Sequence, residues 1–251
     1  MFASALIGTV AQAAPKRLLV VGQGPDGHPP GTHEFMAGVK EVETLLKPFA
    51  SDIQITATKA DEPWAEGPGM IDQAEAILLL VTQGARWMQT DANRLAALKR
   101  LAARRGAIIA LHWSIGAHEA QYIQGQLALL GGTRGGPQRK YKVIENDVQL
   151  AEATHPILRG LHGFRIKDEF YYRLDLVPPS PQFHPLLKTN LDGNDETICW
   201  AWERPDGGRS FGYVGLHFHE NWQRPEYRRL VTQGVLWSLG LPIPETGVRV
   251  E

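Results

Sequence analysis

Short runs of consecutive apolar residues recur along the first half of the chain, and each ends at a glycine or a polar residue. Residues 18–22, 76–81 and 107–112 are apolar at nearly every position, which is typical of strands buried on both faces. Residues 53–57 are predicted to form a further strand. The segments between these strands predict helices over residues 33–49, after a cap at Thr32, over 92–105, after Thr90 and Asp91, and over 119–130. This alternation predicts a mostly parallel sheet with helices on both faces.

The pattern changes after residue 130, where short strand-like segments follow one another without a long helix between them. These segments are residues 140–146, 164–166 and 169–174. Residues 198–202 and 210–216 are joined by the Gly/Pro-containing segment 204–208, which predicts a hairpin. Pro225 is expected to open a final helix that Gly240 ends. We therefore expect one α/β domain over residues 14–251, built as a three-layer sandwich around a central, mostly parallel sheet.

Composition narrows the class of protein only a little. The 251 residues include 43% hydrophobic and 21% charged residues, with a net charge of −1, so nothing points to nucleic acid or to an anionic membrane surface as a partner. The glycine-rich segment 131–136 lacks the Gly-Lys-Ser/Thr ending of a phosphate loop, and we expect no nucleotide cofactor. Cys199 is the one cysteine and lies in an apolar run, which predicts a buried and unreactive thiol.

The N-terminal segment has features of a signal peptide. Residues 2–10 are mainly apolar, and Ala11-Gln12-Ala13 has the small-x-small pattern of a signal-peptidase site. The segment is too short to span a bilayer, and no other segment is long and apolar enough to do so. It lacks a basic start, so a simple helix is the alternative. We expect residues 1–13 to direct export to the periplasm or the medium.

Histidines gather where the predicted strands end. His33 follows the loop after the first strand, His112 closes residues 107–112, and His217 and His219 end the last strand beside Glu220. Ligands bind beyond the carboxyl ends of the strands in open parallel sheets, so His33, His112 and His217 are expected to meet in one cleft. Alternate strand positions face the same way, which would place His219 beside His217. An ordinary polar strand end is the alternative interpretation.

His112 occupies a strand-to-helix turn, where many α/β enzymes place their reacting group because the turn exposes the side chain. Histidine at this position excludes serine- or cysteine-type attack from it, and a packed histidine is the structural alternative. His112 and His219 are therefore candidates for acid–base chemistry, since imidazole titrates near neutrality. Neutral imidazoles also suit Zn²⁺ or a similar divalent ion, and His33, His112 and His217 are the candidate ligands.

Carboxylates and aromatic rings complete the candidate site. Asp168 and Glu169 precede two tyrosines and are candidates for moving protons, binding metal or accepting hydrogen bonds from sugar hydroxyls, with a solvated acidic turn as the alternative. Tryptophan rings offer apolar faces for sugar C–H groups. The candidate substrate-binding residues are Trp113, Glu34, Gln83, Trp87 and Trp222.

Several short motifs, in order along nearly the whole chain, resemble those of the ThuA-like (trehalose utilisation) family. They are Thr32-His33-Glu34-Phe35, Ala110-Leu111-His112-Trp113, Leu130-Gly131-Gly132, His155-Pro156-Ile157-Leu158-Arg159-Gly160-Leu161, Asp168-Glu169-Phe170-Tyr171, Gly215-Leu216-His217 with Trp222, and Gly234-Val235-Leu236-Trp237-Ser238. The resemblance implies a flavodoxin-like fold of the class I glutamine amidotransferase type and a link to disaccharide, glycoside or keto-sugar metabolism. Amidotransferases carry cysteine where this chain has His112, so we do not expect a glutaminase.

Three functions follow from these patterns. The first is a carbohydrate-active enzyme, a hydrolase, lyase or isomerase, that uses the histidine cluster with or without a divalent metal. The second is a non-catalytic sugar- or partner-binding module, because a fold alone does not imply catalysis. The third is an amidase-like hydrolase with another nucleophile. The expected partner is a small-molecule carbohydrate, and the sequence leaves a homo-oligomer open.

Overall fold

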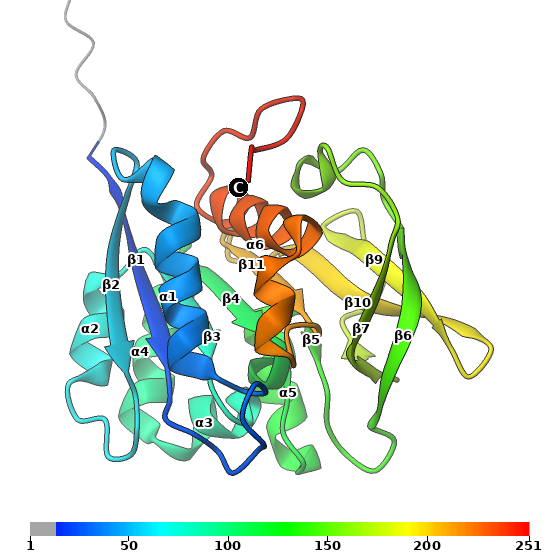
Figure 1. Cartoon of the computed structure of the whole chain (residues 1–251). Coiled ribbons are helices and arrows are strands. Elements are labelled where there is room, and N and C mark those ends of the chain that lie inside the picture. The colour runs from blue at the N-terminus through cyan, green and yellow to red at the C-terminus, as the bar shows by residue number, and fades with distance from the viewer. Residues whose placement is uncertain (1–13, 251) are drawn as a thin grey trace, which may run out of the picture.

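The computed structural model describes residues 14–250, which form a nine-stranded sheet with helices on both faces (Figure 1). In spatial order the strands are β2 (Ile53–Lys59), β1 (Lys16–Gly22), β3 (Ala76–Leu80), β4 (Ala107–Leu111), β11 (Arg209–Tyr213), β10 (Asn194–Glu203), β9 (Phe183–Leu191), β6 (Lys140–Leu150) and β7 (Phe164–Tyr172). The predicted α/β sandwich with a mostly parallel central sheet is confirmed. The predicted signal peptide, residues 1–13, lies outside the described residues.

The five strands from β2 to β11 are parallel and carry the helices. Two helices, α1 (Phe35–Leu46) and α6 (Pro225–Ser238), pack against each other on one face, which is toward the viewer in Figure 1. The other face carries α2 (Gly67–Gln73), α3 (Gly84–Thr90), α4 (Ala92–Ala103) and α5 (Ile123–Leu130). The sequence pattern did not predict α2, whose glycines and proline favour turns, or α3.

The helix caps agree with the sequence at one position and differ at another. Asp91 caps α4 as predicted, because its carboxylate accepts the backbone N–H of Arg94. The predicted cap at Thr32 is wrong: α1 begins at Phe35, and the Thr32 hydroxyl donates to the carbonyl of Pro29 instead. The chain is thus turned sharply between Pro29 and Phe35, which places His33 at the edge of the sheet.

From β11 onward the sheet continues as an antiparallel extension made of β10, β9, β6 and β7. The hairpin of β10 and β11 is confirmed, whereas β9 was not predicted and β7 is one strand where the sequence indicated two segments. The extension curls back, because Asp168 on β7 accepts backbone N–H groups from Leu216 and His217, just beyond β11. The last strand in spatial order therefore returns to the edge where the parallel strands end.

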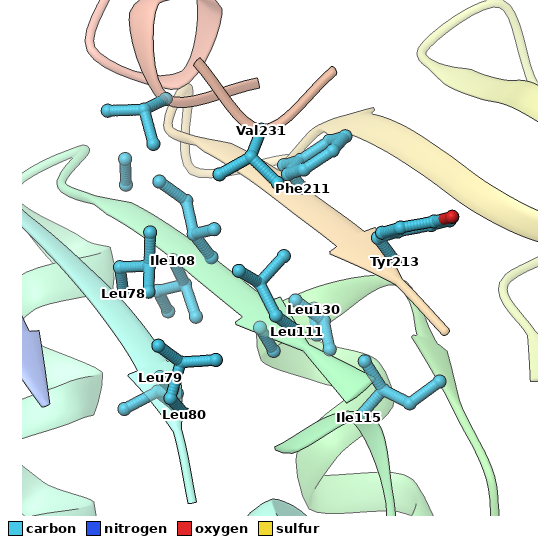
Figure 2. Packing of buried hydrophobic residues seen from close by; sticks show 14 of the residues in the cluster. Leu78, Leu79, Leu80, Ile108, Leu111, Ile115, Leu130, Phe211, Tyr213 and Val231 are labelled. Atoms are coloured by element: carbon cyan, nitrogen blue, oxygen red, sulfur yellow. The ribbon is translucent and has the colours of Figure 1, made fainter. Parts of the chain in front are cut away.

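The core lies between the parallel strands and the helices. Figure 2 shows Leu78 of β3, Ile108 and Leu111 of β4, Phe211 of β11 and Val231 of α6 packed together, all buried. Continuous burial of β3 and β4 on both faces explains why these strands were easy to predict from apolar runs. Among residues 14–250, no helix has the length and apolar character needed to cross a membrane.

Cys199 is fully buried in the centre of β10, as predicted. Burial raises the pKa of its thiol well above the ordinary value, so the thiol stays protonated. It lies in the antiparallel hairpin, whereas the strand-to-helix turn after β4 carries His112.

Candidate functional site

Three histidines and one glutamate meet at the carboxyl edge of the parallel strands. His33, His112, His217 and Glu169 each offer a ligand atom, and these atoms all lie within 4.8 Å of one another. The structure thus brings together the three histidines that the sequence placed at strand ends, and adds one of the two predicted carboxylates.

His112 follows β4 directly and begins a turn of 3-10 helix, η2 (His112–Ile115). Its φ of 50° lies in the left-handed region, which is strained for a residue with a side chain. Ser114 ties this turn to β3, because its hydroxyl accepts the N–H of Val81 and donates to the same residue's carbonyl. A Cβ on Gly84 would lie 2.1 Å from the Ser114 carbonyl oxygen, so only glycine allows this close approach. The backbone at His112 is therefore held from two sides.

His33 and His217 lie on two loops that are bonded to each other. The backbone N–H of His33 donates to the carbonyl of His217 over 3.1 Å, and the N–H of His219 donates to Gly31. His33 and Leu216 also have left-handed φ values, 51° and 81°. Strained backbone at both loops and at His112 is typical of functional sites, where the surrounding structure enforces an unfavourable conformation.

The ring orientations of two histidines are set by acceptors behind them. His112 Nδ1 lies 2.7 Å from the carbonyl oxygen of Val214, so Nδ1 carries the proton and donates. His33 Nδ1 lies 2.7 Å from a carboxylate oxygen of Asp26 and donates in the same way. Burial raises the pKa of Asp26, but its hydrogen bonds with His33 and Thr82 outweigh this and lower it, so the carboxylate stays ionised. In both rings Nε2 is left as a lone pair facing the cluster.

The two lone pairs face each other at short distance, because His33 Nε2 lies 2.8 Å from His112 Nε2. His217 Nδ1 lies 3.2 Å from the same His112 nitrogen. Burial lowers the pKa of His33 and lowers that of His112 far more, with the neighbouring histidine charges adding to the effect at both rings. Protonation of either ring is therefore disfavoured, so a shared proton does not account for the close approach of the two nitrogens. A bound cation other than a proton would account for it.

Glu169 supplies the carboxylate of the cluster. Its Oε2 lies 3.4 Å from both His112 Nε2 and His217 Nδ1. Burial raises the pKa of Glu169, but the hydrogen bond from His217 and the electrostatic interactions with His112 and His217 lower it to about 2, so the carboxylate is ionised at neutral pH. The hydroxyl of Tyr171, two residues further along β7, lies 3.2 Å from His112 Nε2. Burial and the charge of Glu169 raise the pKa of Tyr171 well above its ordinary value, so it keeps its proton.

The residues fit a divalent metal. Donor atoms at about 2.0–2.1 Å from a tetrahedral Zn²⁺ are spaced about 3.3 Å apart. Four of the spacings in the cluster are 2.8–3.4 Å, close to that value, and every pair of ligand atoms lies within 4.8 Å. Val214 and Asp26 behave as the outer partners that orient metal-bound histidines. Imidazole nitrogens with an ionised carboxylate suit zinc and other first-row divalent ions.

Exposure distinguishes the floor of the cluster from its open face. The side chains of His33 and His112 are 2% exposed, whereas those of His217 and Glu169 are 10% and 11% exposed. His28 stacks on His33 with ring centroids 3.8 Å apart, is 42% exposed and bonds through Nδ1 to Asp26. A cavity of about 620 Å³ is lined by Asp26, His28 and His33. Glu34, a candidate substrate-binding residue from the sequence, lines the same cavity. That volume is within the range of small-molecule sites, about 300–1,000 Å³.

Asp168 lies behind the cluster and not at its open face. It is fully buried, and its two carboxylate oxygens accept the backbone N–H groups of Glu169, Leu216 and His217 and the hydroxyl of Tyr227. Burial raises the pKa of Asp168, while these donors favour its ionised form. The carboxylate thus connects β7, the loop after β11 and α6.

The remaining predicted residues lie around the cluster. His219 is not a member: β11 ends at Tyr213, four residues before His217, so the alternation expected of a strand does not apply, and His219 begins the 3-10 helix η5 (His219–Gln223). Trp222 and His219 border a narrow crevice beside His33. Gln83 and Trp87 line a separate cavity of about 470 Å³, where Trp87 stacks with Arg94. Trp113 lies near the cluster, with its ring centroid 6.5 Å from that of His33.

Sequence reasoning missed Asp26, His28 and Tyr171 as site residues. Asp26 and His28 lie in the Gly/Pro-rich loop after β1, whose conformation no periodic pattern predicts. Tyr171 could have been found, because Glu169 and Tyr171 are alternate residues of a strand and share a face.

The order of the parallel strands and the turn after β4 give the chain a class I glutamine amidotransferase-like α/β fold. A glutamine amidotransferase from Thermotoga maritima has this fold, with a TM-score of 0.53 and 8% identity over 90% of this chain and 99% of that one. A cytoplasmic protein from Salmonella typhimurium gives a TM-score of 0.57 at 11% identity, covering 89% of this chain and 98% of that one. At these identities the likeness shows the fold alone.

Within this class the chain belongs to the ThuA family, described as trehalose utilisation, whose sequence profile it matches over residues 18–238. The structure of a ThuA-like protein from Bacteroides uniformis has a TM-score of 0.67 at 13% identity, covering 93% of this chain and 95% of that one. No curated protein matches the chain significantly. The family resemblance predicted from the motifs is confirmed.

Proposed function

We propose that this protein is a metal-dependent enzyme acting on a carbohydrate, with His33, His112, His217 and Glu169 holding the ion. The observation that carries the proposal is the 2.8 Å approach of two ring nitrogens that both present lone pairs, in a buried site that disfavours extra protons. The family description, trehalose utilisation, supports a sugar as the substrate class. A divalent ion at such a site acts as a Lewis acid on a substrate oxygen and lowers the pKa of bound water.

Glu169 serves as a ligand in this proposal and not as a general base. A carboxylate with a pKa near 2 is in the form that metals bind, but it is too weak a base for efficient proton transfer at neutral pH. Asp168 has a positioning role, because it holds the backbone of Leu216 and His217 and so sets where the His217 ring lies.

His28 is the residue we propose for moving protons. It is the exposed histidine beside the cluster, and its Nδ1 bond to Asp26 fixes the ring tautomer, as a carboxylate does for a catalytic histidine. Nε2 is then the atom that takes or gives a proton to a sugar hydroxyl in the 620 Å³ cavity. Pro29, Pro30 and Phe35 line the same cavity and offer apolar surface to sugar C–H groups.

Glutaminase activity is not part of the proposal. The turn after β4 carries His112, and the thiol of Cys199 is buried in β10. Neither residue provides an exposed thiolate, which is the nucleophile that cysteine-type acyl transfer requires.

Two measurements on wild-type protein purified without chelator test the proposal. Elemental analysis should find close to one divalent ion per chain, and disaccharides and glycosides, native and oxidised, should be screened for turnover before and after chelation. His28→Gln should keep the metal and lose activity, whereas His112→Ala should lose both. His162→Gln, at an exposed histidine that is not a member of the cluster, is the control and should change neither. Metal-free protein, or binding of sugar without turnover of any kind, would favour the binding module instead.

A further inference from the structure

Arg134 is a buried arginine whose guanidinium has no hydrogen-bond or ion-pair partner within residues 14–250. It follows the short strand β5 (Gly132–Thr133), and its backbone is bonded to Ile115 and Ala117 next to the turn that carries His112. The residue is 4% exposed. Its Nε and Nη1 are fully buried without a hydrogen-bond acceptor, and it forms no salt bridge with any residue of 14–250.

The two other buried arginines show how this protein normally satisfies such a side chain. Arg204, 3% exposed, donates to the Asp206 carboxylate, to Ser210 and to two backbone carbonyls. Arg94, 2% exposed, pairs with the Glu62 carboxylate over 2.7 Å. A buried cation is costly unless it is paired and hydrogen-bonded. Arg134 differs from both, because its side chain has neither an ion pair nor a hydrogen bond within residues 14–250.

Aromatic rings contact Arg134 without using its donors. The guanidinium carbon lies 4.7 Å from the centroid of Trp113 and 4.4 Å from that of Tyr171. These contacts stabilise the charge through the ring faces. The N–H groups of a guanidinium point outward in its own plane, so stacking leaves them available to a planar oxyanion.

Arg134 lies close to the histidine–glutamate cluster. Tyr171, which it stacks on, places its hydroxyl 3.2 Å from His112 Nε2. The carboxylate of Glu169 favours the charged form of Arg134 but is directed at His112 and His217. His118, packed 5.2 Å from the Trp113 ring, has its pKa lowered by burial and by the charges of Arg134 and Arg139. Within residues 14–250 no carboxylate forms an ion pair with Arg134.

We propose that Arg134 binds a carboxylate of the substrate, which makes the substrate a sugar acid, either an aldonate or a uronate. A carboxylate accepts two parallel N–H bonds from a guanidinium, and this fork geometry gives orientation as well as affinity. A single guanidinium fork matches the two oxygens of one carboxylate, so it suits a monoanion better than a phosphate dianion. The inference rests on the proposed function, because it assigns the substrate class of the same site.

Calorimetric binding of matched ligands tests the proposal. Glucuronate and maltobionate should bind at least about ten-fold more tightly than glucuronate methyl ester and maltitol, which lack the charge. Arg134→Gln should remove this preference. Arg139→Gln removes a charge from the same region without the aromatic contacts, and should keep most of the preference. Four outcomes would each overturn the assignment. Wild-type protein could bind the acid and its neutral partner equally, bind neither acid, or bind glucose 6-phosphate more tightly. Arg139→Gln could also lose the preference for the acid as fully as Arg134→Gln.

Two further measurements separate this inference from the metal proposal. Arg134 is not in the ligand set, so Arg134→Gln should retain the metal content of the wild type, and the chelated wild type should retain its preference for the acid. If wild-type protein contains no metal but still prefers the acid, the proposed function is refuted and the Arg134 assignment stands. Arg134→Met, which removes a buried unpaired charge, should melt no lower than wild type without ligand. A fall of more than about 5 °C would show a structural role and overturn the proposal.

Discussion

Zn²⁺ should stabilise the wild-type protein against unfolding and should hardly stabilise a His112→Ala variant. An ion that binds only the native state at a hundred-fold excess over its Kd adds about 2.7 kcal/mol to the free energy of unfolding. For a chain of about 250 residues, each kcal/mol shifts Tm by about 2–4 °C, so the wild-type Tm should rise by about 5–11 °C. The cluster supplies this energy because its four ligand atoms already lie within 4.8 Å of one another.

The His112→Ala substitution removes the nitrogen that lies nearest to the three other ligand atoms. His112 Nε2 is 2.8 Å from His33, 3.2 Å from His217 and 3.4 Å from Glu169. The substitution also leaves the Val214 carbonyl without its partner, which costs about 1–3 kcal/mol in the metal-free protein. Relief of the lone-pair contact with His33 offsets part of that cost. The shift in Tm on adding metal is therefore the quantity to compare, and not Tm itself.

The assay is differential scanning calorimetry on chelator-stripped, dialysed protein with increasing Zn²⁺. His162→Gln serves as the control, since it removes an exposed imidazole that lies outside the cluster. It should show the wild-type shift. A wild-type protein whose Tm does not respond, or a His112→Ala protein that responds as strongly as wild type, would refute the reasoning.

Three further predictions concern the rest of the molecule. Burial lowers the pKa of His155 to about 4 from 6.5, so the unfolded state binds more protons between those values. The free energy of unfolding should fall by about 3 kcal/mol as the pH drops through that window, and His155→Gln should flatten this part of a urea-denaturation profile. Asp168→Asn places an amide N–H₂ against the backbone N–H groups of Leu216 and His217. It should lower the free energy of unfolding in urea by at least about 2 kcal/mol and should weaken metal binding. Cys199→Ala should leave turnover unchanged, and the native thiol should react with a labelling reagent only as fast as the protein unfolds.

The parallel half of the fold was predictable because its strands are buried on both faces. Continuous apolar runs at β1, β3 and β4 follow from that burial, and the helices between them keep their capping or amphipathic patterns. The convergence of His33, His112 and His217 followed from the rule that parallel strands end at one edge. This part of the site depends on topology, which the sequence pattern specifies.

The antiparallel half and the carboxylates were harder to predict, because they depend on tertiary contacts. β6 exposes much of its length to solvent and β9 contains a proline, so neither has the apolar run of a buried strand. The choice of Glu169 over its neighbour Asp168 depends on how β7 curls back toward the loop after β11. Asp26 belongs to an irregular loop, and its partnership with His33 is visible only in three dimensions.

The curled sheet has a consequence for the order in which the site forms during synthesis. Pairs within the cluster are separated by 79 and 105 residues along the chain, and Glu169 and His217 come from its second half. A nascent chain that has emerged only as far as η2 carries His33 and His112 but lacks the other two ligands. The ion would then join segments from both halves of the chain, much as a disulfide closes a long loop. Metal loading would therefore follow the docking of β7 and would report completion of folding.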